Sequence, residues 1–329
     1  MKVRFGYRAV EERYQPSQLL KYAALADRAG FEFLCISDHF HPWFHRGGCA
    51  GQAWVWLGAA GSVTKNVTMG TGVTTCIYRY DPAIVAQSFA TLDEMYPGRI
   101  FLGIGSGEAM NEMPMAKEGQ VWPPREELLE RTIEAVEIIR ALWTRDFVDY
   151  KGKYNKLTAA NLYTKPKKRI PIYFAASGPK AAHAAGRLGD ALMTVGESEL
   201  TPKIFGWFDE GAREAGKDPS KMPRMVEMKV SYGDDFDEAL ESTSMWIPVK
   251  GSLGIADPRE LDKKREGVDP HCLADTVFTD IDRLIGEIEK LIKLGFSEVQ
   301  LSSNSPDEEK LIRDFSAKAL PYLKEIYAE

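Results

Sequence analysis

The densest group of residues able to do chemistry is a short segment that holds three of the chain's five histidines. Its sequence is Ser37-Asp38-His39-Phe40-His41-Pro42-Trp43-Phe44-His45. Imidazole is a common metal ligand, but on an extended loop His39 and His41 diverge, so a metal site is the least favoured interpretation. General-base chemistry by His39, with Asp38 nearby and Trp43 closing the pocket, is the second interpretation. A loop histidine that only packs against tryptophan is the third, and the residues alone do not decide between these last two.

A run of glycines lies further along the chain, in Gly103-Ile104-Gly105-Ser106-Gly107-Glu108. It matches the GxGxxG pattern of dinucleotide-binding folds only loosely, and its flanking residues do not fit such a fold. Because glycine has no side chain, the run would let the backbone approach a flat ring system closely. The alternative is tight packing where a strand turns into a helix.

Two further segments are candidates for binding one phosphate group. Ala175-Ala176-Ser177-Gly178-Pro179 precedes an expected helix, and the free N–H groups at a helix N-terminus favour anions. The alternative role of Ser177 is to cap that helix. Thr194-Val195-Gly196 is the second candidate, because barrel folds often bind phosphate on their late loops.

Strand-like and helix-like segments alternate along the whole chain. The expected strands are 3–9, 33–38, 67–74, 100–107, 172–177, 191–195, 225–232 and 298–302. The expected helices are 16–29, 51–63, 82–95, 124–143, 179–188, 201–215, 236–246, 281–294 and 307–327. This alternation predicts an α/β fold in which eight parallel strands close into a (β/α)8 barrel. An open doubly wound sheet would need phosphate-binding glycines in its first strand–helix turn, where we find none.

Two insertions interrupt the alternation. Residues 147–157 predict a small hairpin, and residues 248–275, which lack clean periodicity, predict a cap after the seventh strand. No linker rich in Gly, Ser or Pro divides the chain, so we expect one domain over residues 1–329. In barrels of this type the loops at the carboxyl ends of the strands build the active site. All of the candidate segments above follow such strand ends.

Composition limits the possible partners and the location. The net charge is −6, which disfavours nucleic acid. No apolar run approaches the ~20 residues of a membrane helix, so no membrane partner is expected. The four cysteines have no CxxC spacing, and the first residues lack a signal peptide's apolar core. We therefore expect a cytoplasmic protein with reduced thiols.

Several segments together resemble the coenzyme F420-dependent dehydrogenases of the bacterial luciferase-like superfamily, the group that includes the secondary alcohol and glucose-6-phosphate dehydrogenases. The resemblance spans nearly the whole chain. It rests on Ser37-Asp38-His39-Phe40-His41-Pro42-Trp43, Arg79-Tyr80-Asp81-Pro82-Ala83-Ile84-Val85-Ala86-Gln87, Met95-Tyr96-Pro97-Gly98-Arg99 and Gly105-Ser106-Gly107-Glu108-Ala109-Met110-Asn111-Glu112.

The resemblance implies a deazaflavin, coenzyme F420, in the carboxyl-end mouth of a luciferase-like barrel. It implies that His39 takes the proton of a substrate hydroxyl, that Trp43 and Glu108 flank the reacting carbon and the ring, and that the protein is a homodimer. A non-prolyl cis peptide is implied at Gly72-Val73, and Glu12 matches a pocket acid, which we group with Trp246 and Lys250 as the substrate pocket. The residues expected to bind the cofactor are Asp38, Gly72, Val73, Thr75, Gly107, Asn111, Ala176, Ser177, Gly178, Thr194 and Val195.

The substrate is where the chain departs from part of this group. Members that act on sugar phosphates hold the phosphate with lysine and arginine, and the matching positions here fall at Glu197 or Ser198, near Lys250 or Gly251, and near Ala274. Two expected cations are absent, so a small uncharged secondary alcohol is favoured. Lys250, Lys263, Lys264 and Arg265 could supply charge from the cap, but a solvated role is favoured for them.

Three alternatives stay open. The first is the same machinery acting on a sugar 6-phosphate such as glucose 6-phosphate. The second is an FMN-dependent luciferase-like monooxygenase. The third, a silent coenzyme carrier, is disfavoured because it would not need His39, Trp43 and Glu108.

Overall fold

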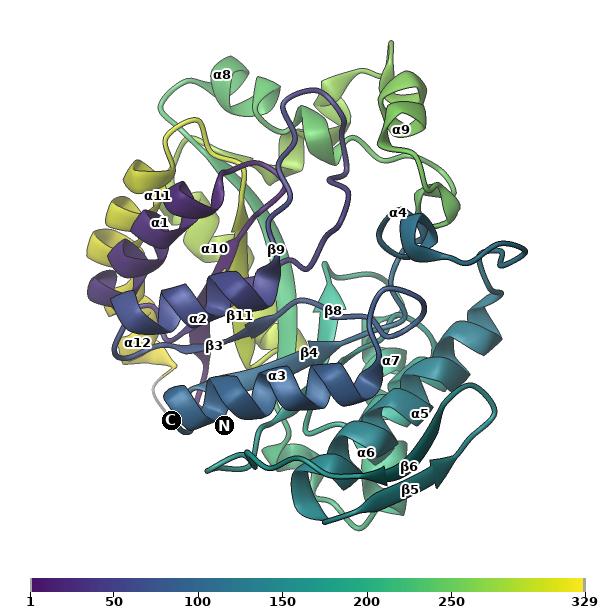
Figure 1. Cartoon of the computed structure of the whole chain (residues 1–329). Coiled ribbons are helices and arrows are strands. Elements are labelled where there is room, and N and C mark those ends of the chain that lie inside the picture. Colours follow the sequence, from purple (N-terminus) through teal and green to yellow (C-terminus); the bar gives the residue numbers. More distant parts are fainter. Residues whose placement is uncertain (1, 328–329) are drawn as a thin grey trace.

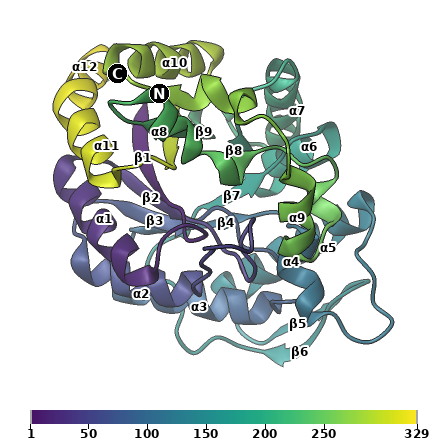
Figure 2. The ribbon, with the colours of Figure 1, turned by 90° about the horizontal axis from the view of Figure 1, so that it is seen from above.

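The computed structural model describes residues 2–327 and has the expected closed (β/α)8 barrel. Neighbouring barrel strands are all parallel, and β8 pairs with β9 to close the ring. Figure 2 shows the ring from above, with helices around it. The barrel strands are β1 (Arg4–Ala9), β2 (Phe33–Ile36), β3 (Thr68–Thr71), β4 (Ile100–Ile104), β7 (Ile172–Ala175), β8 (Ala191–Val195), β9 (Arg224–Tyr232) and β11 (Glu298–Ser303). All eight expected strands are thus confirmed, several with earlier ends.

The surrounding helices follow from local signals in the sequence. They are α1 (Pro16–Ala29), α2 (Ala53–Val63), α3 (Pro82–Met95), α5 (Arg125–Thr144), α6 (Pro179–Leu188), α7 (Thr201–Glu214), α10 (Ile281–Leu294), α11 (Glu308–Asp314) and α12 (Leu320–Ile326). Asp81 and Asp280 cap α3 and α10, because each side chain accepts a backbone N–H of the first turn. Gly30 and Gly295 end α1 and α10 in the left-handed conformation. None of the helices in residues 2–327 is both long and apolar enough to cross a membrane.

Several predicted elements differ in detail. The expected helix 236–246 is shorter: α8 (Phe236–Glu241) ends there and a 3-10 turn (Ser244–Trp246) follows. The single helix expected over 307–327 is interrupted by a π-helical turn, Phe315–Ala319, between α11 and α12. The helix expected from residue 51 begins at Ala53, because the Gln52 side chain caps it. A short helix, α4 (Ala109–Glu112), was not expected.

Both insertions are present. The hairpin consists of β5 (Val148–Lys151) and β6 (Lys156–Ala160), which pair antiparallel. The cap, residues 248–275, holds a helix, α9 (Pro258–Arg265), that its sequence pattern did not reveal. Only Pro258 and Leu261 of α9 are buried, so the helix has too few apolar residues to produce a periodic signal. A short strand, β10 (Val277–Phe278), follows the cap and pairs with the end of β9.

The interior of the barrel has an apolar layer between the Arg4–Glu298 ion pair at the amino ends of the strands and a second charged layer near the mouth. Its apolar part is one cluster, formed by Phe33, Cys35, Phe101, Tyr173, Ala191, Met193 and Met225. Nearer the carboxyl ends, Arg8 of β1 forms an ion pair of 3.1 Å with Glu227 of β9. Arg8 also donates a hydrogen bond of 2.8 Å to the Gly72 carbonyl, which is the carbonyl of the cis peptide Gly72-Val73. The predicted cis bond is present, and a buried guanidinium binds its carbonyl oxygen.

This ion pair gives a test of the barrel's charged layer. Replacing Glu227 by Met leaves the Arg8 guanidinium buried without its carboxylate, so we expect the free energy of unfolding to fall by about 3–5 kcal/mol. Denaturant titration measures this loss. The double variant Arg8→Met/Glu227→Met removes both charges and should recover most of it. Equal losses in the single and double variants would contradict a role for the unpaired charge.

Candidate active site

The candidate residues gather at one end of the barrel. The loop after β2 and the cap lie together at the top of Figure 1, opposite the two chain ends. Glu12 follows β1, His39 follows β2, Thr75 follows β3 and Glu108 follows β4, so the carboxyl ends of four adjacent strands supply the group. Parallel strands bring their carboxyl ends to the same edge, which is why residues far apart in the chain meet here.

His39 is buried, and both of its ring nitrogens face polar partners. Nε2 lies 3.3 Å from Oε1 of Glu12. Nδ1 lies 3.2 Å from the carbonyl oxygen of His41 and 3.2 Å from Nδ2 of Asn111. The Trp43 ring lies beside the imidazole, with 6.0 Å between ring centroids. In the protonated ring both N–H groups therefore have an oxygen acceptor, Glu12 at one side and the His41 carbonyl at the other.

Glu11 and Glu12 are adjacent and buried, yet their pKa values shift in opposite directions. Burial would raise the pKa of Glu12, but His39, Arg8 and the Ser37 hydroxyl, which donates a 2.5 Å hydrogen bond, together lower it. Burial and the charge of Glu12 raise the pKa of Glu11 well above its ordinary value. Two neighbouring carboxyl groups whose environments shift their pKa values in opposite directions can take different roles. Glu12 is the ionised partner of the imidazole, and Glu11 accepts the backbone N–H of His39 at 2.5 Å.

Asn111 connects the loop of His39 to the end of β4. Its Oδ1 accepts the backbone N–H groups of Phe40 at 2.9 Å and His41 at 3.4 Å. Its Nδ2 donates to Oε2 of Glu108 at 2.8 Å. These bonds fix which way the amide points. One side chain thus orients both His39 and Glu108.

Asp38, expected to bind the cofactor, has its carboxylate engaged by protein groups. Arg79 forms an ion pair with it at 3.1 Å, and the hydroxyls of Thr74 and Tyr80 donate at 2.6 and 3.2 Å. Arg79 also donates to the Asp38 carbonyl at 2.7 Å and reaches the Glu112 carboxylate at 3.5 Å. Arg79 belongs to one of the family motifs, but no role was predicted for it from the sequence. It anchors the residue that precedes His39.

The glycine run lies close to the segment that contains the cis peptide. A side chain at Gly105 would meet Cγ2 of Val73 at 2.7 Å, and one at Gly107 would meet Cγ2 of Thr75 at 2.6 Å. Gly107 also has a positive φ of 67°. Tight packing, one of the two interpretations above, therefore accounts for both glycines by itself. The same packing leaves a surface of backbone and small side chains, which suits a flat ring.

The two phosphate candidates lie on neighbouring strands β7 and β8. Gly178, not Ser177, is the N-cap of α6, and no side chain caps the helix, so the capping role considered for Ser177 is wrong. The first N–H groups of α6 are consequently left for water or an anion. Ala176 is buried and Ser177 is exposed. Thr194 is buried, whereas Val195 is 72% exposed at the end of β8. These residues could hold a phosphate group at this rim.

The cap fastens the loop that carries Trp43. Arg265 of α9 donates hydrogen bonds to the Trp43 carbonyl at 2.6 Å and to the Ile247 carbonyl at 3.1 Å. Asp262 accepts the backbone N–H groups of His45 and Arg46 at 3.1 and 3.4 Å. Arg265 is therefore not solvated, contrary to expectation. The three lysines of the cap, Lys250, Lys263 and Lys264, are exposed.

Three charged interior residues near the mouth, Arg8, Glu227 and Lys229, were not predicted as site residues. Arg8 and Lys229 lie inside strands, and Lys229 lies 5.5 Å from the centroid of the Trp246 ring. A signal was available. Glu227 and Lys229 are two residues apart in the predicted strand 225–232, and this spacing puts two charges on one face.

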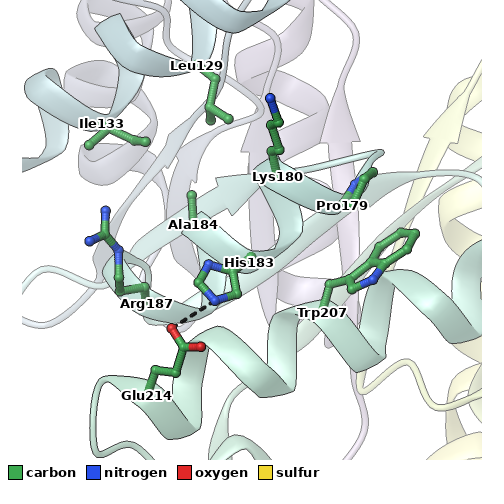
Figure 3. A pocket seen from close by; sticks show the side chains of 9 residues that line it. All are labelled: Leu129, Ile133, Pro179, Lys180, His183, Ala184, Arg187, Trp207 and Glu214. Atoms are coloured by element: carbon green, nitrogen blue, oxygen red, sulfur yellow. Dashed lines mark ion pairs between the residues drawn. The ribbon is translucent and has the colours of Figure 1, made fainter.

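Two other features lie apart from this group. A cavity of about 490 Å³ on the outside of the barrel is lined by α5, α6 and α7, with an ion pair between His183 and Glu214 at 2.9 Å (Figure 3). Of the candidate segments discussed above, only Pro179 contributes to its lining. Within residues 2–327, no group of three or more His, Cys, Asp or Glu side chains is arranged to hold a metal ion.

Comparison with known proteins gives the family. The model of the luciferase-like monooxygenases matches residues 3–284. The chain is 38% identical over 335 residues to an F420-dependent glucose-6-phosphate dehydrogenase of Microbacterium testaceum, covering 99% of both proteins. It is 36% identical over 334 residues to the enzyme of the same name from Mycolicibacterium smegmatis, again covering 99% of both.

A solved structure agrees with these relatives. An F420-dependent secondary alcohol dehydrogenase in complex with an F420-acetone adduct superposes with a TM-score of 0.92 at 41% identity, over 98% of this chain and 99% of that one. The chain therefore belongs to the luciferase-like monooxygenase family, and over almost its whole length it resembles the F420-dependent dehydrogenases of that family.

Proposed function

We propose that this protein is an F420-dependent dehydrogenase that oxidises a secondary CH–OH group. The observation that carries the proposal is the imidazole of His39 at the barrel mouth, 3.3 Å from an ionised Glu12. Alcohol oxidation releases a proton and a hydride, so the site needs a proton acceptor beside a hydride acceptor. The bound deazaflavin would supply the hydride acceptor. The relatives that share this fold at 36–41% identity are dehydrogenases of this cofactor.

His39 is the proposed base for the substrate hydroxyl. Its charged form has an acceptor for each N–H, because Glu12 faces Nε2 and the His41 carbonyl faces Nδ1. Proton transfer to the ring is therefore stabilised by groups already in place, and little rearrangement is needed. Glu12 is a positioning residue in this scheme. Trp43 covers the imidazole from one side and limits the access of water.

We assign the cofactor to the surface between β3, β4, β7 and β8. Gly72, Val73, Thr75 and Gly107 would contact its ring, because they lie at the adjacent carboxyl ends of β3 and β4, where glycine backbone and small side chains form the surface. Glu108 would lie at the ring edge, oriented by Asn111. The phosphate of the cofactor would meet the N-terminus of α6. The residues proposed for that contact are Ala176, Ser177, Gly178, Thr194 and Val195.

A sugar 6-phosphate is the second candidate substrate. The relatives at 36–38% identity favour it, since their names state glucose 6-phosphate. The structural relative at 41% identity, named a secondary alcohol dehydrogenase, favours a small alcohol. The exposed Glu197 and Lys250 offer no cationic pocket for a phosphate at the expected positions.

The choice of cofactor is directly testable. We expect the purified protein to bind the deazaflavin at least about tenfold more tightly than FMN, a difference of ~1.4 kcal/mol. Fluorescence titration with each cofactor measures both dissociation constants. Tighter binding of FMN, together with oxygen consumption in the presence of reduced FMN, would instead indicate the monooxygenase alternative.

Replacing His39 by Ala tests the base. Loss of a general base lowers turnover by about 10²–10⁴-fold. The loss of deazaflavin absorbance on adding 2-butanol or glucose 6-phosphate measures turnover. Cofactor binding should change little, because the ring surface lies on β3 and β4. His45→Ala, an exposed histidine of the same loop, is the matched control and should retain activity. Full turnover in the His39 variant would rule out this assignment.

We also propose that two copies associate through the outer face of α2 and α3. The sequence of α2 contains no charged residue. Val55 and Val63 of α2 are 75% and 45% exposed, and Ile84 and Met95 of α3 are 52% and 49% exposed. The two helices are neighbours on the barrel's outer surface (Figure 1). An exposed apolar face of this kind is typical of a protein interface.

The dimer is tested by placing charge on this face. Val55→Asp should convert the protein to a monomer, because burying an unpaired carboxylate in the interface is costly. Light scattering after size-exclusion chromatography measures the mass. Val121→Asp changes an equally exposed valine, 72% accessible, on another surface and should leave the mass unchanged. A monomeric parent protein, or a dimer unaffected by Val55→Asp, would refute this interface.

A further inference from the structure

Strand β9 places a lysine inside the barrel mouth. Lys229 is in register with Ser302 of β11, and Ser302 is in register with Arg8 of β1. Neighbours in register in a parallel sheet point to the same face. Arg8 points into the barrel, since its guanidinium reaches Glu227 and the Gly72 carbonyl. Lys229 therefore also points inward, at the same level as Arg8.

The ammonium of Lys229 has no acidic partner. It is half-buried, and it lies 5.5 Å from the centroid of the Trp246 ring. Glu227, the nearest acid along the strand, pairs with Arg8. Within residues 2–327 no carboxylate lies at ion-pair distance from Lys229, and no hydrogen bond satisfies it. Burial lowers the pKa of Lys229, Glu227 opposes this, and the nearby guanidinium groups of Arg8 and Arg265 lower it further.

Four other cations of the site described above have partners. Arg8 pairs with Glu227, Arg79 with Asp38, and His39 faces Glu12. Arg265 is bonded to two backbone carbonyls and lies 3.8 Å from Asp262. Among these five cations, Lys229 is the one for which the described residues provide neither an acidic nor a hydrogen-bonding partner. Partly buried charge without a partner is unfavourable, so the site gains most from an anionic ligand.

A second observation indicates that a polar ligand or water belongs on this side of the barrel. The amide groups of Gln300 and Asn304 are fully buried, and none of their polar atoms has a partner among the described residues. Gln300 is in register with Glu227, one pleat below Lys229. The backbone N–H of Asn304 bonds to the carbonyl of Val230, beside Lys229. Unsatisfied buried amides are uncommon without a bound molecule.

We propose that Lys229 is a specificity-determining residue that binds an anionic substituent, a carboxylate or a phosphate ester, on the substrate whose CH–OH group faces His39. This inference rests on the proposed function and names its substrate class. The absent cap cations argued for an uncharged alcohol, but Lys229 supplies a positive charge from a barrel strand instead. Trp246 forms the apolar wall beside that charge.

The test compares three substrates in three proteins. 2-Butanol is a neutral secondary alcohol, 3-hydroxybutyrate adds a carboxylate to a similar carbinol, and glucose 6-phosphate carries a phosphate ester. The proteins are wild type, Lys229→Met and Lys264→Met, the last of which removes an exposed lysine of the cap. Loss of deazaflavin absorbance gives kcat/KM, and calorimetry gives the binding of 3-hydroxybutyrate and of glucose 6-phosphate without turnover. Fluorescence titration gives the affinity for the cofactor.

The wild type should prefer one of the two anions over 2-butanol. Lys229→Met should lower kcat/KM for that anion by about 10- to 100-fold and weaken its calorimetric binding, leave 2-butanol and the cofactor affinity nearly unchanged, and not lower the melting temperature. Lys264→Met should behave as wild type. A preference for 2-butanol, an equal loss for all substrates, or weakened cofactor binding in Lys229→Met would overturn the proposal. If no substrate bleaches the cofactor, the proposed function fails, and the calorimetric comparison still decides whether Lys229 binds anions.

Discussion

The contact between Glu12 and His39 is the interaction on which the rest of the site depends. It joins the ends of β1 and β2, which are neighbours in the barrel. The Ser37 hydroxyl and the charges of His39 and Arg8 keep Glu12 ionised despite its burial. Glu11 holds the backbone of His39 from the same turn. A carboxylate fixed in this way orients the imidazole and stabilises it once it carries a proton.

Around this contact, the other charged and polar side chains of the site are held in place by hydrogen bonds and ion pairs. Arg79, in the loop after β3, fixes Asp38, and Asn111, in the short helix α4 after β4, fixes Glu108 and the His39 loop. Arg265 and Asp262 fasten the Trp43 loop from the cap, although Arg265 lies 222 positions away in the chain. Pre-positioned polar groups of this kind lower the reorganisation that a reaction needs. Lys229 differs from these residues, because no carboxylate among residues 2–327 pairs with it, and we propose that the substrate supplies the missing negative charge.

The sequence predicted the barrel well because its signals are local. Apolar strands and capped helices can each be recognised from about ten to twenty neighbouring residues. Asp81, for example, marks the start of α3, and Gly30 marks the end of α1. Helix α9 was missed because a polar helix that buries only two residues has no periodic pattern. Lys229 was missed because one lysine in a strand is usually expected to face water. The cap contacts could not be predicted, since no register relates Arg265 to Trp43.

The most direct measurement of the central claim is chemical rescue of the His39→Ala variant by external imidazole, with a secondary alcohol as substrate and the deazaflavin absorbance as readout. We expect turnover to rise with the concentration of neutral imidazole, and Glu12→Gln in the same background to weaken this rescue, because Glu12 would stabilise the added ring after it takes the proton. Turnover that does not respond to imidazole, while the variant still binds the cofactor, would show that His39 is not the base.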